Sequence, residues 1–244
     1  MQHGVVLIKD SLAKEFGIQT GTTLWHARKV FCLIILWTLL IILTTSFTVS
    51  CTDEENLQVY YLDVGQADAA IVVCDDKVMM IDGGNTADSS LVYSILRNTL
   101  RINHIDYIIA THPHEDHIGG LSAVLNACSV DVLYTPTVDY ESKAFRTMMS
   151  YAHKNKTAII VPRPGDSFSV GSAHVEILSP AKNYKNYNDM SIVARITYGE
   201  TAFLFTGDMG WDAEHDLVEA GVDLYADVLK VSHHGSDTSS SYVF

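Results

Sequence analysis

Cysteine is scarce in this 244-residue sequence, and its four cysteines are not spaced as a unit. They stand at Cys32, Cys51, Cys74 and Cys128, with no Cys-x-x-Cys pair among them. A disulfide framework and a zinc knuckle both need cysteines at short, regular spacings, so the sequence excludes both. Cys74 and Cys128 are expected to be small residues of a buried core.

Basic residues are scarce as well. The sequence has 16 Lys and Arg against 29 Asp and Glu, a net charge of −13. Beyond residue 51 the balance is 12 basic against 27 acidic residues, or −15. A domain this acidic has no general attraction for a polyanion such as DNA. Bound divalent cations would reverse the sign locally, so the charge disfavours DNA as a partner without excluding it.

Charge is absent altogether from the stretch Val30 to Val49. About 20 predominantly apolar residues suffice to cross the hydrocarbon core of a membrane. The sequence therefore predicts a membrane anchor at residues 30–51. Arg28 and Lys29 precede this stretch and acidic residues 53–55 follow it. This polarity predicts that residues 1–29 stay in the cytoplasm and that the rest of the chain faces outward, at the cell surface.

The same stretch also fits a lipoprotein signal segment, with residues 1–29 as its leading region. Thr48-Val49-Ser50-Cys51 places small residues directly before a cysteine, as a cleavage and lipidation site requires. Thr48 departs from that pattern, in which an aliphatic residue is usual. A retained helix and a lipid anchor both leave the head outside the cytoplasm, and the sequence leaves both open.

Residues 57–244 are predicted to form one domain, because no repeat, low-complexity tract or second domain follows the anchor. Strands are expected at 57–62, 69–73, 77–81, 105–110, 130–134, 158–161, 174–178, 192–198, 202–205 and 227–231. Helices are expected at 89–100, 121–127, 142–153 and 212–220. This order of elements predicts an α/β domain in which two sheets pack together and helices cover them.

Three histidines and two carboxylates gather in the segment His112-Pro113-His114-Glu115-Asp116-His117. It follows the apolar run Ile105 to Ala110 and precedes Gly119-Gly120 and a helical pattern. The segment is therefore expected on a strand-to-helix loop, where a rigid scaffold can point several ligands inward. Imidazole and carboxylate ligands suit zinc, iron or manganese. His104, His153, His174 and His215 show no such spacing.

This loop resembles the metal-binding loop of the metallo-β-lactamase superfamily. Four further segments resemble its ComEC/Rec2-like branch, which contains the soluble domain of DNA-uptake proteins and stand-alone relatives. They are Tyr61-Leu-Asp63-Val-Gly65-Gln66-Ala67-Asp68, Ile81-Asp82-Gly-Gly84, Thr206-Gly-Asp208 and Leu229-Lys-Val-Ser-His233-His234-Gly-Ser236. The resemblance spans Leu57 to Phe244 and implies the αββα four-layer sandwich, here with an N-terminal membrane anchor.

The resemblance also implies two divalent metal ions, with Zn²⁺ favoured and Mn²⁺ as the alternative. His112 and His114 would hold one ion, and Asp116 and His117 its neighbour. Asp208, which ends the run Ala202 to Phe205 in a Thr-Gly-Asp turn, would bridge the two.

His233 and His234 are adjacent, and neighbouring side chains are expected to point in opposite directions, so that at most one faces the metals. His233 is expected as the ligand and His234 as the proton donor or an outer residue, with the reverse left open. Asp116, His233 and His234 are thus the residues expected to take part in catalysis.

Outer residues are expected to orient these ligands. Asp82 resembles the aspartate of the superfamily's first motif, and the resemblance implies that it buttresses the histidine loop instead of binding metal. A buried carboxylate can do this by anchoring the second ring nitrogen of a histidine ligand. Asp63 and Asp68 are expected to be structural or to line the mouth of the pocket. Asn188 and Ser191 stand where other branches of the superfamily place a further histidine, and are expected beside the metals without binding them.

The sequence thus predicts a metal-dependent hydrolase, with a phosphodiesterase or nuclease-like reaction in which hydroxide held by the metals attacks the phosphorus. The alternatives are an envelope phosphodiester or phosphocholine esterase, another ester or lactam hydrolase, and a non-catalytic surface module. Relatives usually continue past the position of Phe244, so either the sequence is truncated there or the end of the second sheet is missing. The substrate and the oligomeric state are left open.

Overall fold

The computed structural model describes residues 56–244. The predicted cytoplasmic segment 1–29 and the predicted anchor 30–51, with Cys51, lie outside the described residues. Within residues 56–244, no helix is both long enough and apolar enough to cross a membrane.

The first sheet has six strands in their sequence order, β1 to β6. They are β1 (Leu57–Tyr61), β2 (Ala70–Cys74), β3 (Lys77–Ile81), β4 (His104–Ile109), β5 (Ser129–Tyr134) and β6 (Ala158–Ile160). The strands β1 to β3 form an antiparallel meander, and β3 to β6 run parallel to one another. Parallel neighbours need helical crossovers, and the helices between β3 and β6 supply them.

Helices cover the outer face of this sheet. They are a 3₁₀ turn (Thr86–Asp88), α3 (Ser89–Ser94) with a π-helical turn (Ile95–Thr99), α4 (Glu115–Ile118), α5 (Leu121–Ala127) and α6 (Lys143–Lys154). Leu96, Leu121 and Phe145 are buried against Met80 and Ile108 of the sheet. Ser142 caps α6, because its side-chain oxygen accepts a hydrogen bond from the Phe145 N–H at 3.0 Å.

The second sheet has five strands in the order β11-β10-β9-β8-β7. They are β7 (Ser167–Val170), β8 (Ala173–Ser179), β9 (Val193–Tyr198), β10 (Thr201–Phe205) and β11 (Val228–Lys230). Only the β10–β11 pair is parallel, and its crossover contains α7 (Trp211–Ala220). A final 3₁₀ turn follows β11 at Ser232–Gly235.

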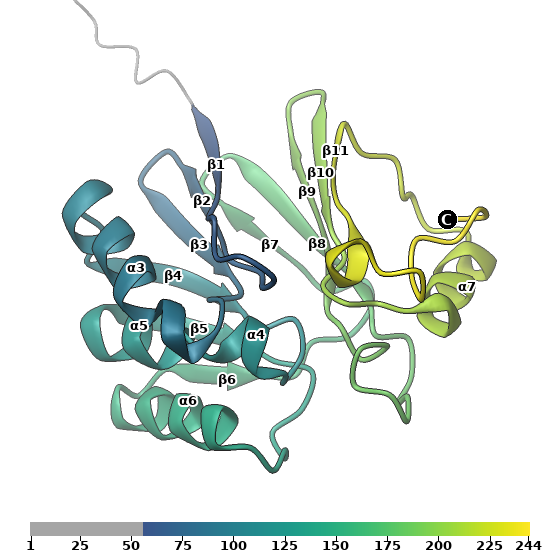
Figure 1. The fold of residues 1–244 in the computed structure, drawn as a ribbon. Helices are drawn as coiled ribbons and strands as arrows, with labels where there is room; N and C mark the ends of the chain where they lie inside the picture. Colours follow the sequence, from purple (N-terminus) through teal and green to yellow (C-terminus); the bar gives the residue numbers. More distant parts are fainter. Residues whose placement is uncertain (1–55) are drawn as a thin grey trace, which may run out of the picture. The chain divides into compact units, whose positions relative to one another are not determined.

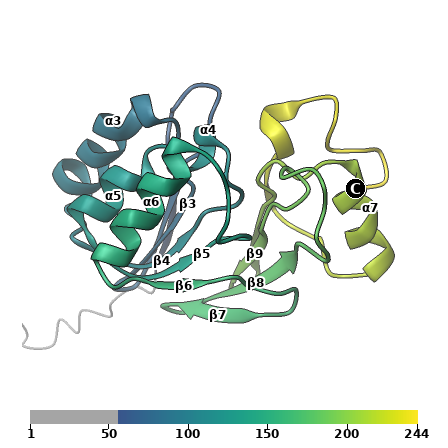
Figure 2. The same ribbon diagram turned by 90° about the horizontal axis from the view of Figure 1, so that it is seen from below.

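The two sheets pack face to face with helices outside both (Figures 1 and 2). In β3, Met79 and Ile81 face the core between the sheets, whereas Val78 and Met80 face the helices. This alternation buries both faces of the strand, as expected for a covered sheet. On the far side of the second sheet a third core contains Leu217 of α7. The predicted αββα sandwich is therefore confirmed.

The predicted elements agree with the structure in all but a few places. The strand β7 was not predicted, because Ser167–Val170 offers only two apolar residues to a pattern search. The predicted helix 89–100 is interrupted by the π-helical turn at Ile95–Thr99. Asp116 and His117 lie on the single-turn helix α4 and not on a loop, since the chain turns helical directly after His114. The buried positions of Cys74 and Cys128 confirm them as core residues.

Candidate metal centre

The conspicuous polar residues of the sequence lie just beyond the carboxyl ends of four strands. Asp82 follows β3, the histidine loop follows β4, Asp208 follows β10, and the His233-His234 pair follows β11. Since β3 and β4 are parallel, and β10 and β11 are parallel, each pair ends at the same edge of its sheet. The site therefore lies where these two edges meet.

Glycines allow the surrounding turns to approach closely. A Cβ atom on Gly120 would lie 2.1 Å from the carbonyl oxygen of Gly83. The amide of Gly83 in turn donates to the carbonyl of His117 at 2.6 Å. At Gly207, φ is +53° and a Cβ would meet the Ser191 side chain at 2.9 Å. Only glycine fits this turn, which presents Asp208.

Asp208 lies at the centre of the site. It is 2% exposed, and four histidine Nε2 atoms surround its carboxylate. The distances are 3.1 Å to His117, 3.6 Å to His234, 3.7 Å to His112 and 3.8 Å to His233. A single carboxylate within reach of four imidazoles could contact more than one cation.

The other expected ligands fall into two groups around Asp208. In one, Nε2 of His112 lies 3.1 Å from Nδ1 of His114. In the other, Asp116 lies 3.1 Å from Nε2 of His234 and 3.8 Å from Nε2 of His117. The donor atoms thus lie in two clusters around Asp208, and the division of the histidine loop between two ions stays a prediction.

The donor set fits divalent metal ions. His117 Nε2 and Asp208 Oδ1 are buried and make no hydrogen bond within residues 56–244, although they lie only 3.1 Å apart. Buried polar atoms are rarely left without partners, so such a pair calls for a ligand between them. Imidazole nitrogens and carboxylate oxygens, with no thiolate among them, suit zinc or manganese.

Asp82 anchors the histidine loop through polar contacts, as expected. Its carboxylate accepts hydrogen bonds from the Thr111 N–H at 2.8 Å and the Thr111 hydroxyl at 2.7 Å. It also lies 2.7 Å from Nδ1 of His117, which leaves Nε2 of that ring facing Asp208. Burial raises the pKa of Asp82. Burial alone would lower the pKa of His117, but Asp82 and Asp208 hold it well above its usual value.

The charges at the centre differ between the histidines. Burial, reinforced by the neighbouring imidazoles, places the pKa of His112 well below its usual value. Burial also lowers the pKa of His114. Hydrogen bonds to Asp116 and Asp68 raise the pKa of His234 to about 9. The lowered pKa values favour neutral His112 and His114, which can bind a cation directly, whereas a cation must displace a proton from both His117 and His234.

The expectation that only one of His233 and His234 faces the centre is wrong. Their backbones have φ of 49° and 52°, in the left-handed region. Side chains alternate in direction on extended backbone, and in this turn both rings lie within 3.8 Å of Asp208. His234 is the deeper of the two, at 13% side-chain exposure against 31% for His233.

The segment Asn188 to Ser191 lies beside the centre, as expected. The Ser191 hydroxyl accepts a hydrogen bond from the Asp208 N–H at 3.0 Å. The Asn188 side-chain nitrogen lies 3.4 Å from Nε2 of His233. Asp189, which was not among the expected residues, accepts from the Gly210 N–H at 3.0 Å and so fixes the start of α7 next to Asp208.

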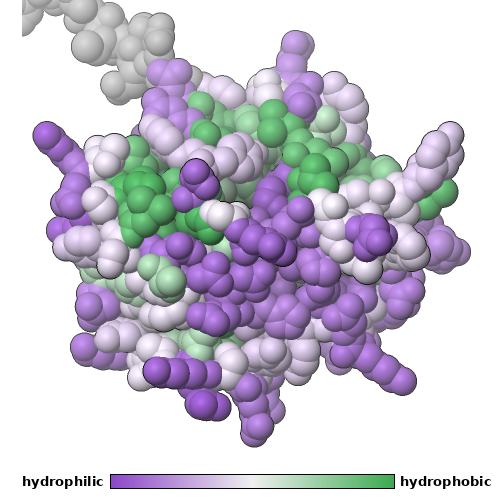
Figure 3. Space-filling view, viewed as in Figure 1, coloured by the Kyte–Doolittle hydropathy of each residue, from purple (hydrophilic) through white to green (hydrophobic). Residues whose placement is uncertain are grey.

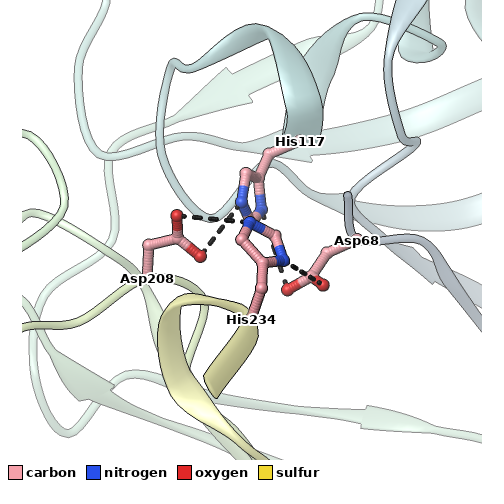
Figure 4. Close-up of side chains that lie close together, drawn as sticks. All are labelled: Asp68, His117, Asp208 and His234. Carbon is pink, nitrogen blue, oxygen red and sulfur yellow. Dashed lines mark ion pairs between the residues drawn. The ribbon is translucent and has the colours of Figure 1, made fainter. Parts of the chain in front are cut away.

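Asp68 was expected to be structural or to line the pocket mouth, and it lies at the centre itself. Its carboxylate is 3.3 Å from Nδ1 of His234, and it is 7% exposed. Figure 4 shows Asp68, His117, Asp208 and His234 drawn together from four separate segments. Sequence spacing could not reveal this, because Asp68 and His234 are far apart along the chain.

A cavity of about 210 Å³ opens beside the centre. It is lined by Asp208 and His233 together with Asn188, Trp211 and Thr238, among others. Trp211 is 57% exposed. On the side of His114, the Tyr140 ring centroid lies 6.3 Å from that of His114 and 4.7 Å from that of Tyr187. The face seen in Figure 3 is hydrophilic across its middle, with hydrophobic patches beside it.

Residues 62–242 match the family model described as the metallo-beta-lactamase superfamily. The chain is 27% identical to ComE operon protein 3 of Bacillus subtilis over 216 residues, which cover 81% of this chain and 28% of that protein. It is 26% identical to Recombination protein 2 of Haemophilus influenzae, over 94% of this chain and 28% of that protein. The chain thus matches less than a third of the length of these relatives.

A solved structure shows the same fold. The Rm3 metallo-beta-lactamase superposes with a TM-score of 0.50 at 15% identity, over 72% of this chain and 75% of that one.

Proposed function

Because the chain belongs to the metallo-β-lactamase superfamily, in its ComEC/Rec2-like branch, we propose that it hydrolyses phosphodiester bonds with the help of two divalent metal ions. The observation that carries the proposal is the Asp208 carboxylate, surrounded by four histidine Nε2 atoms at 3.1–3.8 Å. Four imidazoles and a carboxylate within reach of all of them supply enough donors for two ions that share the carboxylate.

His112, His114 and Asp208 would hold one ion, and Asp116, His117, His234 and Asp208 the other. The two metal ions would lower the pKa of a water molecule toward neutrality and stabilise negative charge on the phosphoryl oxygens. Zn²⁺ is the first choice and Mn²⁺ the second, because all donors are nitrogen or oxygen. No serine or cysteine nucleophile is required.

Two adjacent histidines would supply a further metal ligand and the proton donor. His234 is proposed as the ligand of the adjacent pair, which reverses the assignment expected from the sequence. Its Nε2 lies 3.1 Å from Asp116 and 3.6 Å from Asp208. His233 is proposed as the proton donor, since it lines the open cavity and its Nδ1 lies 3.0 Å from the Thr238 hydroxyl. A histidine there can protonate the leaving oxygen.

The test is hydrolysis of bis-p-nitrophenyl phosphate by the full chain in the presence of Zn²⁺ or Mn²⁺. We expect Asp208→Asn to abolish turnover. His174→Ala is the matched control for replacing a site histidine by Ala and should leave turnover unchanged, because His174 is an exposed histidine of β8 far from the centre in the fold. Replacing His233 by Ala should lower turnover while the metal content stays unchanged. A protein that binds both metals but cleaves only carboxyl esters or lactams would refute the substrate class.

DNA is the second candidate substrate. It is favoured by the names of the relatives, which include Recombination protein 2 and the competence protein ComA of Neisseria gonorrhoeae. The charge of −15 beyond residue 51 favours smaller phosphodiesters instead. An envelope phosphodiester or phosphocholine is a further substrate consistent with that charge. A metal-loaded chain inert toward all of these would indicate a non-catalytic surface module.

We also propose that residues 30–51 tether the domain to a membrane, with residues 57–244 outside the cytoplasm. The uncharged stretch, preceded by Arg28 and Lys29, supports this orientation. Protease added to intact cells should digest the domain, and complete protection would refute the orientation. Cys51→Ala should release the protein from the membrane fraction only if the anchor is a lipid.

A further inference from the structure

Lys230, the last residue of β11, was not among the residues expected at the site, yet its side chain reaches the centre. We infer that Lys230 and Asp68 form a positioning pair that fixes the ring of His234 for metal binding. The inference rests on the proposed metal site, and it concerns how this chain prepares one of its ligands. Neither residue is proposed to contact the substrate.

A continuous chain of polar contacts joins Lys230 to the centre. Lys230 Nζ lies 2.6 Å from Oδ2 of Asp68. The other carboxylate oxygen, Oδ1, lies 3.3 Å from Nδ1 of His234. On the opposite side of the same ring, Nε2 lies 3.1 Å from Asp116 and 3.6 Å from Asp208. The chain therefore runs from a lysine, through a carboxylate and an imidazole, to the metal-facing atoms.

Asp68 performs for His234 the task that Asp82 performs for His117. A metal-binding histidine usually donates its second ring N–H to a carboxylate, which fixes both the tautomer and the ring plane. Asp82 lies 2.7 Å from Nδ1 of His117, and Asp68 lies on the Nδ1 side of His234. In both cases Nε2 is left to face Asp208. The site thus has two anchoring carboxylates, one for each histidine of this group.

Asp68 is better placed as an anchor than as a metal ligand. Figure 4 shows the His234 ring between the carboxylates of Asp208 and Asp68. Asp116 contacts Nε2 of this ring, whereas Asp68 contacts the other nitrogen, Nδ1. Both Asp68 oxygens already have partners, Lys230 at Oδ2 and His234 at Oδ1. Its backbone is also fixed, since its N–H donates to the Asp116 carbonyl at 3.1 Å.

Lys230 is needed because a buried carboxylate requires a counter-charge. Asp68 is 7% exposed, and a lone carboxylate at that depth would favour protonation or movement toward the cations. Lys230 supplies the charge from the edge strand β11, four residues before His234. The pair also links the loop between β1 and β2 in the first sheet to the last strand of the second sheet. It therefore fixes the turn that carries His234 against the other half of the site.

The test measures Zn²⁺ affinity of the full chain by competition with a chelator. The His112→Ala background removes one ligand group, so that the affinity reports the group that contains His234. In that background Lys230→Met should weaken Zn²⁺ binding by roughly tenfold or more, as other anchoring residues of metal ligands do. Lys230→Arg keeps the cation and should recover most of the affinity.

Lys77→Met is the matched control. Lys77 lies 2.9 Å from Asp106, whose side chain is 8% exposed, so this pair is also a lysine bound to a buried carboxylate between the ends of strands. It lies away from the centre, at the start of β3. Loss of this pair should leave the Zn²⁺ affinity unchanged. A second readout is the Nδ1–H proton of His234 in the zinc-loaded protein, which should lose its downfield NMR position in Lys230→Met but not in Lys77→Met.

Equal Zn²⁺ affinity in Lys230→Met and in its parent would overturn the inference. If Lys230→Met does not fold, Asp68→Asn decides, because it keeps the side-chain volume but removes the charge that holds His234. Unchanged affinity in Asp68→Asn would likewise overturn it. A chain that shows these losses but cleaves no phosphodiester refutes the proposed reaction and leaves the positioning role intact.

Discussion

The carboxylate of Asp208 is shared by both groups of donor atoms, and its loss should therefore differ from the loss of any histidine. Asp208→Ala should lower occupancy at both metal positions. His112→Ala should empty mainly one, because Nε2 of His112 lies 3.1 Å from His114 and 3.7 Å from Asp208. Metal content of the purified variants, counted by atomic emission, checks this. Two bound metals in the Asp208→Ala variant would contradict the shared role.

For single residues, the sequence predicts which residues belong to the site better than it predicts how their side chains are arranged there. The histidine loop was expected at the site from its spacing, and Asp82 and Asp208 from their resemblance to motifs of the superfamily; the structure brings them together. The roles of His233 and His234 could not be predicted, since they depend on a left-handed turn that no local pattern announces. Asp68 and Lys230 reach the site only through the pairing of remote strands. Their positions follow from tertiary packing, which is invisible to spacing arguments.

Among the elements, β3 and β4 are joined by a charged contact that should make stability depend on pH. The Asp106 carboxylate of β4 accepts from the Val78 N–H and from Lys77, both at 2.9 Å. Burial would raise the pKa of Asp106, but these hydrogen bonds outweigh it and hold the pKa below its model-compound value of 3.8. A carboxyl group whose pKa is lowered by folding stabilises the fold above the unfolded pKa.

Asp106→Asn should therefore lower the free energy of unfolding by roughly 1.5–3 kcal/mol at pH 7, the range for hydrogen bonds to a charged group. The difference from the unsubstituted protein should shrink as pH falls below about 4 and through the folded pKa, where Asp106 becomes protonated. Urea unfolding at pH 7 and at lower pH measures it. A difference that stays constant over this range would contradict the charge-based account.

Helices with a strong local sequence pattern were predicted correctly, whereas helices and strands with a weak pattern were missed. Leu121–Ala127 was predicted with its observed bounds because apolar residues recur at helical spacing there. The strand β7 has exposed serines at two of its four positions, so its place in the sheet depends on pairing with β8. The helix α4 has only four residues, Glu115–Ile118, and packs against Gly83 by close backbone contact. Such short elements are stabilised by their surroundings more than by their own residues.

For the molecule as a whole, the acidic balance sets which substrates can approach. Residues beyond position 51 carry −15, while the metal ions would add positive charge only at the site itself. A long polyanion must cross the negative surroundings before it reaches that site, whereas a small diester with one charge is repelled much less. Repulsion of this kind is screened over about 10 Å at 0.1 M salt.

Salt should therefore affect the two substrate classes differently. For a single-stranded oligonucleotide, kcat/KM should rise by roughly threefold or more between about 10 mM and about 150 mM monovalent salt, because screening removes the repulsion. For bis-p-nitrophenyl phosphate, kcat/KM should stay nearly constant. Initial rates at fixed Zn²⁺ and at substrate concentrations below KM measure both values, and the small diester controls for any effect of salt on the metals.

A protein built to bind DNA through basic side chains behaves in the opposite way, since its affinity falls steeply with salt. A fall in kcat/KM for the oligonucleotide would thus mean that basic side chains recruit the substrate despite the net charge, and would reverse the preference for small phosphodiesters.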